Sequence, residues 1–215
     1  MINDDGPVVI LGASGHAKVI VDMLQERGEI RLAGCVSRES GDVLGLPWLG
    51  DDEVLPQLLA SGLRRAFVAI GDNRVRAKLI RHLLGLGFGM INAISSHAVV
   101  SRSVGLGTGV AIMPGAIVNV ECVIEDGAII NTAAHVDHDG RIGACAHVGP
   151  GCSLAGNVTI GEGAFLGVGT CVIPGRTVGP WSTVGAGAVV VRDVPSHLTV
   201  VGVPARALRR SDVQA

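Results

Sequence analysis

The sequence contains no tyrosine and only three phenylalanines and two tryptophans among 215 residues. Charged residues are also few, 17% of the chain, and the formal net charge is −2. A charge balance this close to neutral gives no reason to expect a nucleic acid or an anionic membrane as a partner. The apolar runs are far shorter than the roughly 20 residues that a membrane-spanning helix needs, so the positive mean hydropathy must have another source.

The sequence has no C-x-x-C pair either, although it contains five cysteines. Several of them fall at or beside the small-residue positions of a repeat described below. We therefore interpret them as buried, reduced thiols, with a zinc or redox role as the alternative.

The start of the chain, with Asn3, Asp4 and Asp5, does not have the pattern of a secretory signal, so we expect a cytoplasmic location.

What the sequence has in abundance is glycine, 32 residues, together with a strict period of six. Every sixth residue is aliphatic at Ile112, Val118, Ile124, Ile130, Val136, Ile142, Val148, Leu154, Ile160, Leu166, Val172, Val178, Val184 and Val190. This period is neither that of a helix nor that of a plain alternating strand. It predicts a β-helix in which three hexapeptides form one coil, so that the run makes about four and a half coils.

Small residues accompany the aliphatic positions. The next residue is often glycine or another turn former, which we interpret as the tight corner of a three-sided coil. The fifth position of each hexapeptide is mostly Ala, Cys or Gly, as a narrow interior requires. Upstream, Val104 and Val110 keep the spacing but stand two residues out of phase, which predicts a two-residue insertion near Leu106–Ala111.

The first part of the chain has a different sequence pattern, without the period of six. It predicts strands at Pro7–Leu11, Arg31–Val36 and Arg65–Ile70, and helices at Ala17–Arg27, Asp51–Ser61 and Arg74–Leu86. Alternating strands and helices are typical of a small parallel sheet. We therefore expect an α/β half-Rossmann domain over residues 1–95, an all-β left-handed parallel β-helix of hexapeptide repeats over 96–203, and a C-terminal tail over 204–215.

A glycine-rich turn follows the first predicted strand, with Gly12, Ser14, Gly15 and His16. Backbone N–H groups at the start of a helix suit a phosphate, and a tight strand–helix connection is the alternative. The pattern is not G-x-G-x-x-G, which disfavours a dinucleotide. Ser37 and Arg38 stand where an NAD-binding domain often has an acidic residue, and Ser37 could hydrogen-bond a sugar or a base. Asp72 and Asn73, after the third strand, are further substrate-binding candidates.

Three of the seven histidines crowd one part of the repeat, at His135, His138 and His147. Acid–base catalysis is the favoured interpretation, because the pKa of histidine lies near neutrality. A solvated polar corner and a zinc site like that of the γ-class carbonic anhydrases, which share the coil, are the alternatives. His82 and His197 are interpreted as surface residues.

The length of a coil places some of these residues relative to one another. Gly156 follows His138 by three hexapeptides, so it should lie one coil away on the same side. His147 follows His138 by half a perimeter and should face elsewhere within one chain. We therefore hypothesise that His138 and His147 meet only across a subunit boundary, in a trimer of coils.

Five stretches together give the chain a resemblance to the bacterial hexapeptide-repeat sugar acetyltransferases. They are the repeat itself, the GASGH turn, NTAAHVDHD ending at Asp139, LAGNVTIGEGAFLGVG and GVPAR. The sequence is most similar to enzymes that acetylate the 4-amino group of a UDP-linked 4-amino-4,6-dideoxy sugar, as in bacillosamine synthesis. The sialate O-acetyltransferases are relatives. The resemblance covers nearly the whole chain.

The resemblance implies a role for individual residues in a direct transfer from acetyl-CoA. His138 corresponds to the general base, and Asp139 to the adjacent acidic residue, which is often Glu in the bacillosamine enzymes. Asn131 lines the site, His147 lies near the acetyl carbonyl, and the Gly156 N–H is the oxyanion donor. The resemblance also implies a homotrimer, with acetyl-CoA lying between coils.

Two further groups are implied for the ligands. The nucleotide-sugar would be held at Gly12, Ser14, Gly15 and His16, and acetyl-CoA would be bordered by Phe165, Gly167, Val168, Gly185, Ala186, Gly187, Pro204 and Arg206. No metal cofactor is implied. Acetylation of a sialic acid or another sugar hydroxyl remains open because it needs the same base, and a non-acyltransferase, either a zinc hydratase or an assembly scaffold, is the third class.

Overall fold

A computed structural model describes residues 6–208; the expectations for the start of the chain and for residues 209–215 of the tail lie outside this range. The chain divides into two compact units, one ending at Ser96 and one beginning at His97. No helix in residues 6–208 has both the length and the apolar character that crossing a membrane would require.

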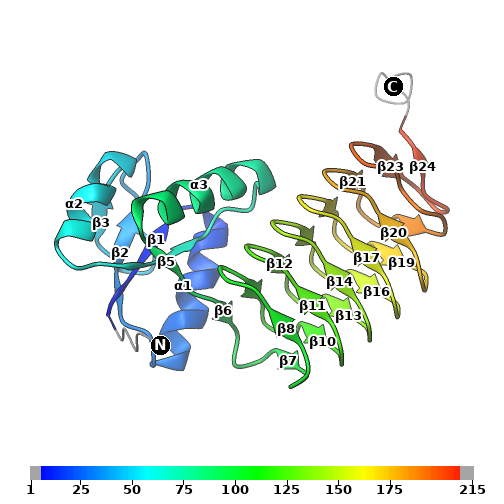
Figure 1. Ribbon diagram of the computed structural model, residues 1–215, viewed down its shortest axis with the longest axis horizontal. Helices are drawn as coiled ribbons and strands as arrows, with labels where there is room; N and C mark the ends of the chain where they lie inside the picture. The colour runs from blue at the N-terminus through cyan, green and yellow to red at the C-terminus, as the bar shows by residue number, and fades with distance from the viewer. Residues whose placement is uncertain (1–5, 209–215) are drawn as a thin grey trace. The chain divides into compact units, whose positions relative to one another are not determined.

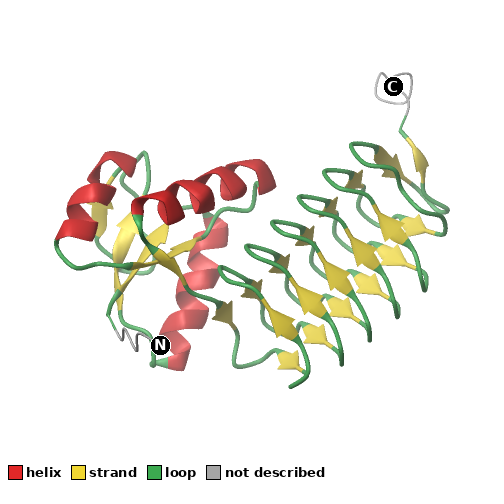
Figure 2. Ribbon diagram, viewed as in Figure 1, coloured by secondary structure: helices red, strands yellow, loops and turns green. Residues whose placement is uncertain are grey.

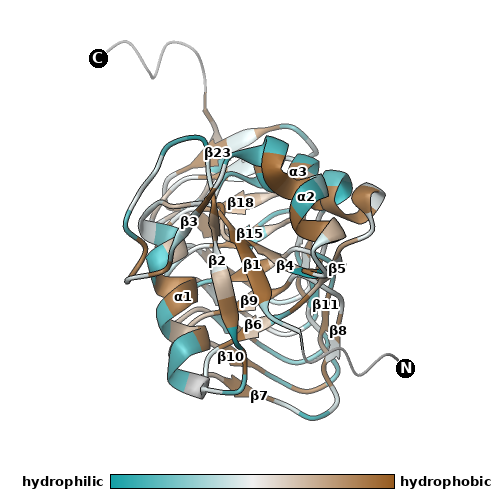
Figure 3. Cartoon of the chain, turned by 90° about the vertical axis from the view of Figure 1, so that its left-hand side faces the viewer, coloured by the Kyte–Doolittle hydropathy of each residue, from teal (hydrophilic) through white to brown (hydrophobic). Residues whose placement is uncertain are grey.

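Unit 1 is a parallel sheet with helices on both faces. Its elements are β1 (Val8–Leu11), α1 (Gly15–Arg27), β2 (Leu32–Val36), β3 (Trp48–Gly50), the 3-10 helix η1 (Asp52–Val54), α2 (Leu55–Ala60), β4 (Arg65–Val68), α3 (Asn73–Leu86), β5 (Gly89–Met90) and β6 (Ala93–Ile94). The sheet order is β3-β2-β1-β4-β5. Figure 3 shows α1 on one side of this sheet and α2 and α3 on the other, as right-handed crossovers dictate.

The predicted strands and helices of unit 1 are all present. The central strand β1 is buried along its whole length, because its residues face helices on both sides. Asp51 caps the start of the helix predicted at Asp51–Ser61, but this segment begins as η1 and becomes α2 only at Leu55. The short strands β3 and β5 were not predicted, because two or three residues carry no readable period.

Unit 2 is a three-sided coil of strands of two or three residues, with one sheet along each side (Figures 1 and 2). Its strands are β7 (Val99–Val100), β8 (Gly105–Leu106), β9 (Ala111–Ile112), β10 (Ile117–Val118), β11 (Val123–Ile124), β12 (Ile129–Ile130), β13 (His135–Val136), β14 (Arg141–Ile142), β15 (His147–Val148), β16 (Ser153–Leu154), β17 (Thr159–Ile160), β18 (Phe165–Leu166), β19 (Cys171–Val172), β20 (Thr177–Val178), β21 (Thr183–Val184), β22 (Val189–Val190), β23 (Thr199–Val201) and β24 (Arg206–Ala207).

The three sheets confirm the predicted left-handed parallel β-helix. One sheet follows β22-β19-β16-β13-β10-β7, the second β20-β17-β14-β11-β8, and the third runs from β24 and β23 through β21, β18, β15 and β12 to β9. All fourteen aliphatic residues of the predicted repeat are at most 2% exposed. Each fully buried aliphatic side chain stabilises the coil by about 1.5–3 kcal/mol.

The predicted insertion near residue 106 is wrong. Strand β8 pairs in register with β11, and β9 with β12, so the period of six continues upstream without a break. Its inward residues there are Val100 and Leu106. Val104 and Val110 stand two residues before an inward strand residue, at the fifth position of the hexapeptide. Val110 is fully buried, because residues two apart on a strand share one face.

The glycines that follow the aliphatic residues do not form the corners, contrary to our interpretation. They allow neighbouring coils to approach closely: a Cβ on Gly161 would lie 2.5 Å from the Pro180 nitrogen, and one on Gly167 would lie 2.6 Å from the Ala186 nitrogen. The corner itself lies three residues after the aliphatic position. There the backbone takes a left-handed φ, for example 58° at Asp139.

None of the five cysteines forms a disulfide, and four of them are buried as expected. Cys171 is the exception, because it lies in β19 at the position that points away from the coil interior. Among residues 6–208 no three His, Cys, Asp or Glu side chains are grouped as metal ligands.

Candidate functional site

The polar stretch of the repeat places an imidazole and a carboxylate side by side at one corner of the coil. His138 and Asp139 occupy the turn between β13 and β14, and their side chains are 56% and 60% exposed. The Nδ1 atom of His138 lies 2.7 Å from Oδ2 of Asp139. The aspartate therefore reaches the ring although it is one methylene shorter than glutamate. This contact leaves Nε2 on the other edge of the ring for a second partner.

The environment of His138 makes its ring more basic. Its pKa is raised, first by the hydrogen bond to Asp139 and then by the negative charge of Asp137. Asp137 accepts hydrogen bonds from the His138 backbone N–H at 2.8 Å and from Nδ2 of Asn119 at 2.9 Å. These two bonds lower the pKa of Asp137. Sequence analysis did not single out Asn119 and Asp137 as site residues, although they stand at equivalent positions of successive coils.

Gly156 lies directly against the ring of His138, as the coil length predicted. A Cβ on Gly156 would lie 2.5 Å from both Cε1 and Nε2 of that ring, so no other residue fits without moving it. Among residues 6–208 no backbone acceptor takes the Gly156 N–H, whereas the next residue donates to the His138 carbonyl oxygen at 2.9 Å. The corner thus presents a basic nitrogen and a backbone donor close together.

His147 occupies a different side of the coil, on β15, and it is only 7% exposed. Its Nε2 lies 2.9 Å from Nδ2 of Asn131. Because the amide nitrogen donates, Nε2 accepts and the ring proton is on Nδ1. The ring meets Phe165 edge to face, with centroids 5.2 Å apart. The structure thus brings together Asn131, His147 and Phe165, but it places them on another side of the coil from His138.

The remaining coenzyme candidates lie in the segments that follow β18 and β21 in the last coils. Gly167 and Val168 follow β18, and Gly185, Ala186 and Gly187 follow β21, one coil further on. Val168 and Phe165 are 59% and 39% exposed. Both side chains are apolar, so this part of the coil offers an apolar surface at the edge of the third sheet.

The C-terminal candidates lie beyond that part of the coil. Pro204 follows a cis peptide bond with Val203. Arg206 lies in β24, which pairs antiparallel with β23. Its side chain is exposed and donates from Nη1 to the carbonyl oxygen of Ala205.

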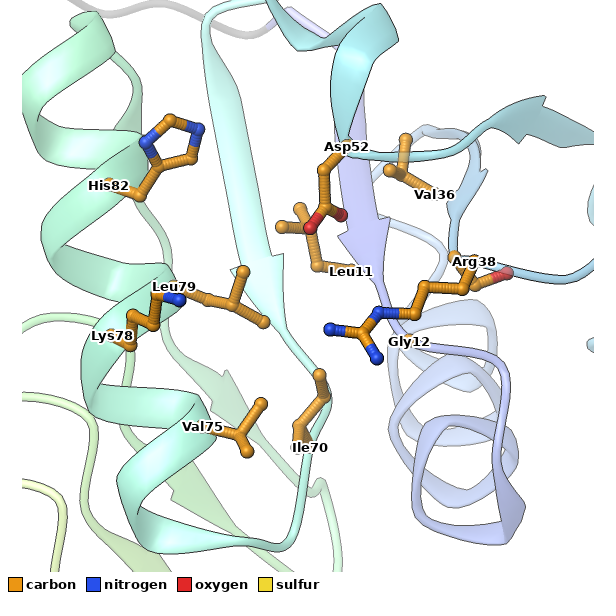
Figure 4. A pocket seen from close by; sticks show the side chains of 11 residues that line it. Leu11, Gly12, Val36, Arg38, Asp52, Ile70, Val75, Lys78, Leu79 and His82 are labelled. Atoms are coloured by element: carbon orange, nitrogen blue, oxygen red, sulfur yellow. The ribbon is translucent and has the colours of Figure 1, made fainter.

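The second candidate site is a cavity of about 450 Å³ in unit 1, shown in Figure 4. Its lining residues are Leu11, Gly12, Val36, Ser37, Arg38, Asp52, Ile70, Val75, Lys78, Leu79 and His82. Part of this lining lies at or just after the carboxyl ends of β1, β2 and β4, which is where open parallel sheets bind ligands, and the rest comes from η1 and α3. The structure thus brings together the predicted residues Gly12 and Ser37.

The predicted glycine turn lies next to this cavity. Gly12 has φ +119°, and a Cβ there would lie 2.8 Å from the Ala69 carbonyl oxygen, so only glycine fits. Ser14 is the N-cap residue of α1, yet its side chain makes no capping hydrogen bond, and the first turn holds no acidic residue. A helix start of this kind favours an anion.

His16 and the two candidates at the start of α3, Asp72 and Asn73, interact with other residues of unit 1. The pKa of His16 is lowered to about 4, chiefly by burial and then by the charge of Arg76, so the ring is neutral at pH 7. Asp72 caps α3 by accepting from the Val75 N–H at 2.8 Å. Asn73 is buried, and its Oδ1 accepts from Arg76 at 2.9 Å. None of the three lines the cavity.

Sequence analysis missed four polar residues of the cavity as ligand candidates: Arg38, Asp52, Lys78 and His82. One signal could have found two of them. Val75, Lys78, Leu79 and His82 follow the i, i+3, i+4, i+7 spacing of a single helix face. His82 is exposed, as predicted, and also lines the cavity.

Comparison with known proteins adds three findings. Residues 7–83 match the family model described as the PglD N-terminal domain. The crystal structure of PerB from Caulobacter crescentus, in complex with CoA and GDP-perosamine, is 53% identical with a TM-score of 0.93, and the match covers 95% of this chain and 98% of that one. The acetyltransferase domain of PglB from Neisseria gonorrhoeae, in complex with acetyl coenzyme A, is 38% identical with a TM-score of 0.88, over 94% and 100% of the two chains.

Curated relatives match over a shorter stretch. Proteins of Staphylococcus aureus that are named as acetyltransferases are 40% identical over 62 residues, which is 29% of this chain and 31% of their own length. The chain therefore spans less than a third of these relatives, whereas its similarity to the two solved structures extends through both units.

Proposed function

Because the chain belongs to the hexapeptide-repeat sugar acetyltransferases, we propose that it transfers the acetyl group of acetyl-CoA to the 4-amino group of a nucleotide-linked 4-amino-4,6-dideoxy sugar. The observation that carries the proposal is the corner formed by His138, Asp139 and Gly156. A base whose second nitrogen is held by a carboxylate stands against a backbone N–H that has no backbone acceptor within residues 6–208.

This corner supports a direct transfer. The neutral sugar amine attacks the thioester carbonyl carbon, so that a C–N bond forms while Nε2 of His138 takes a proton from the nitrogen. The Gly156 N–H stabilises the negative charge on the carbonyl oxygen. The C–S bond then breaks, and the coenzyme leaves as a thiolate that takes up the proton held by His138, which returns the ring to its neutral form. Asp139 keeps the proton of the neutral ring on Nδ1, which leaves Nε2 free to act as the base.

The two ligands are assigned to different parts of the chain. The exposed Phe165 and Val168 and the glycines after β18 and β21 are proposed to contact acetyl-CoA, together with Pro204 and Arg206. The cavity of unit 1 and the α1 N-terminus are proposed to hold the nucleoside diphosphate. The complex of the Caulobacter protein with CoA and GDP-perosamine supports a ligand pair of this kind.

The catalytic unit is proposed to be a homotrimer. Within one chain His138 and His147 lie on different sides of the coil, so a site that needs both must draw them from two subunits. The buried and oriented ring of His147 is then available near the acetyl carbonyl of a coenzyme that lies between coils. The cytoplasmic location and the UDP nucleotide remain predictions.

The experiment that tests the function measures release of free CoA from acetyl-CoA with UDP-, dTDP- and GDP-linked 4-amino-6-deoxy sugars as acceptors. Sialic acid serves as the hydroxyl control. We expect rapid release with an amino sugar and none with sialic acid. Turnover with sialic acid alone would assign the chain to the O-acetyltransferases. The absence of CoA release with every acceptor would overturn the proposal.

The raised pKa of His138 predicts a pH effect. The base must be unprotonated, so kcat/KM falls as the pH drops below its pKa. Asp139→Asn removes the main cause of the rise, and we therefore expect the acidic limb of the pH profile to move to lower pH. The plateau rate should also fall, because a weaker base accepts the proton less well. If the acidic limb of the variant stays at the pH of the wild type, the group that titrates there is the substrate amine and not His138.

A further inference from the structure

The cavity of unit 1 has two kinds of wall. In Figure 4 the apolar side chains of Ile70, Val75 and Leu79 face it from the segment after β4 and from α3, while the Arg38 guanidinium and the Asp52 carboxylate enter from the opposite side. An apolar slot with a few convergent polar groups is suited to a flat ring whose edge carries hydrogen-bonding atoms. The polar groups then decide which ring fits.

The Asp52 carboxylate has no hydrogen-bond or ion-pair partner within residues 6–208. Its neighbour Asp51 caps the 3-10 helix by accepting from the Glu53 N–H at 3.0 Å. Within residues 6–208 neither the Asp52 carboxylate nor the Arg38 guanidinium forms a hydrogen bond or an ion pair, with each other or with another residue. Both charged groups line the cavity and remain available to a ligand.

We propose that Asp52 and Arg38 select a guanine base over a uracil in this cavity. The inference rests on the proposed function, since it concerns the nucleotide of the sugar substrate, and it replaces the UDP nucleotide predicted from the resemblance with a guanine nucleotide. Guanine carries two adjacent donors, N1–H and the 2-amino group, and a carboxylate can accept from both at once. Its O6 and N7 atoms are the acceptors that an arginine contacts with two hydrogen bonds.

Uracil fits these two residues poorly. Its pairing edge presents one N–H between two carbonyl oxygens, so a carboxylate that accepts from the N–H has its second oxygen next to a carbonyl oxygen. The repulsion disfavours the wrong base, in addition to the hydrogen bond that is not made. A pyrimidine would also fill less of the cavity than a purine.

The test measures the dissociation constants of GDP, inosine diphosphate and UDP by calorimetry with the full chain. Inosine diphosphate lacks only the 2-amino group, so it isolates one of the two donors. We expect the wild type to bind GDP more tightly than inosine diphosphate, and both more tightly than UDP. Asp52→Asn should weaken GDP binding by about 10- to 100-fold, and UDP binding should stay unchanged or improve.

Two further variants sharpen the comparison. Glu53→Gln removes a neighbouring exposed charge that does not line the cavity, and it should leave all three constants unchanged. Arg38→Met should weaken both purine nucleotides equally, because O6 and N7 are present in each. A wild type that prefers UDP, or an Asp52→Asn variant that keeps the wild-type ratio of GDP to UDP, would overturn the inference.

Acetyl transfer is measured separately, as release of CoA with the GDP-linked and UDP-linked amino sugars. Transfer that proceeds with an unaltered base preference in Asp52→Asn would refute the guanine assignment and leave the proposed function intact. Nucleotide binding in the expected order without transfer to any amino sugar would support the guanine assignment and refute the function.

Discussion

His138→Ala is expected to lower kcat by about two to four orders of magnitude, because a positioned general base contributes a factor of this size. The KM values for acetyl-CoA and the sugar should change little, since the ring accepts a proton only as the amine attacks. Folding should be unaffected, because the side chain is 56% exposed. Its backbone N–H, which holds the turn through Asp137, is retained in the variant. Release of CoA and the melting temperature are the two measurements.

The matched control is His135→Ala. His135 is an exposed histidine of β13 in the same polar stretch, and its side chain makes no hydrogen bond within residues 6–208. It should keep wild-type turnover. If His138→Ala retained normal turnover, or if both variants lost it equally, the base would have to be another group.

A mixing experiment tests whether His138 acts with His147 of a neighbouring subunit. His138→Ala and His147→Ala are each purified, then unfolded, mixed in equal amounts and refolded together. With random assembly about one site in four draws both intact histidines from different subunits, so about a quarter of the wild-type activity should return. Recovery of no activity from a mixed trimer would show that the two residues do not cooperate across the boundary.

The coil could be predicted from the sequence because its geometry is a direct function of spacing. Three hexapeptides make one turn of the helix, so residues that far apart in sequence become neighbours in space. This relation predicts that Gly156 lies beside His138, and the structure confirms the contact. The wrong prediction of an insertion has the same origin. Val110 is aliphatic and also points inward, so in the sequence it resembles the aliphatic residue of a hexapeptide.

The cavity of unit 1 could not be predicted in this way. Its polar residues come from separate segments, with Arg38 after β2 and Asp52 at the start of a short 3-10 helix. Two aspartates stand next to each other there, and the sequence does not tell which one caps the helix and which one faces the cavity. The answer depends on the local backbone, in which Asp51 takes the extended conformation of a cap.

Gly156→Ala is expected to lower kcat by about 10²- to 10³-fold, although the change is a single methyl group. The added Cβ would lie 2.5 Å from Cε1 and Nε2 of His138, so the ring must leave its place between Asp139 and Gly156. A displacement of about 1 Å in a catalytic group can cost a factor of 100. The fold should survive, because the methyl meets an exposed side chain and not backbone. Gly85→Ala, which meets nothing within 4 Å, is the control that should keep full activity.

The double variant shows how Gly156→Ala acts. Once His138 is replaced by alanine, there is no ring for the methyl group to displace, while the backbone N–H of residue 156 is retained. If displacement of the base is the whole effect, adding Gly156→Ala to His138→Ala should cost nothing more, and the two losses will not add. A further loss in the double variant would mean that the methyl group also occupies the space of the acetyl group, which would place the reacting carbonyl directly above Gly156. Wild-type turnover in Gly156→Ala itself would contradict the close packing on which the proposed site depends.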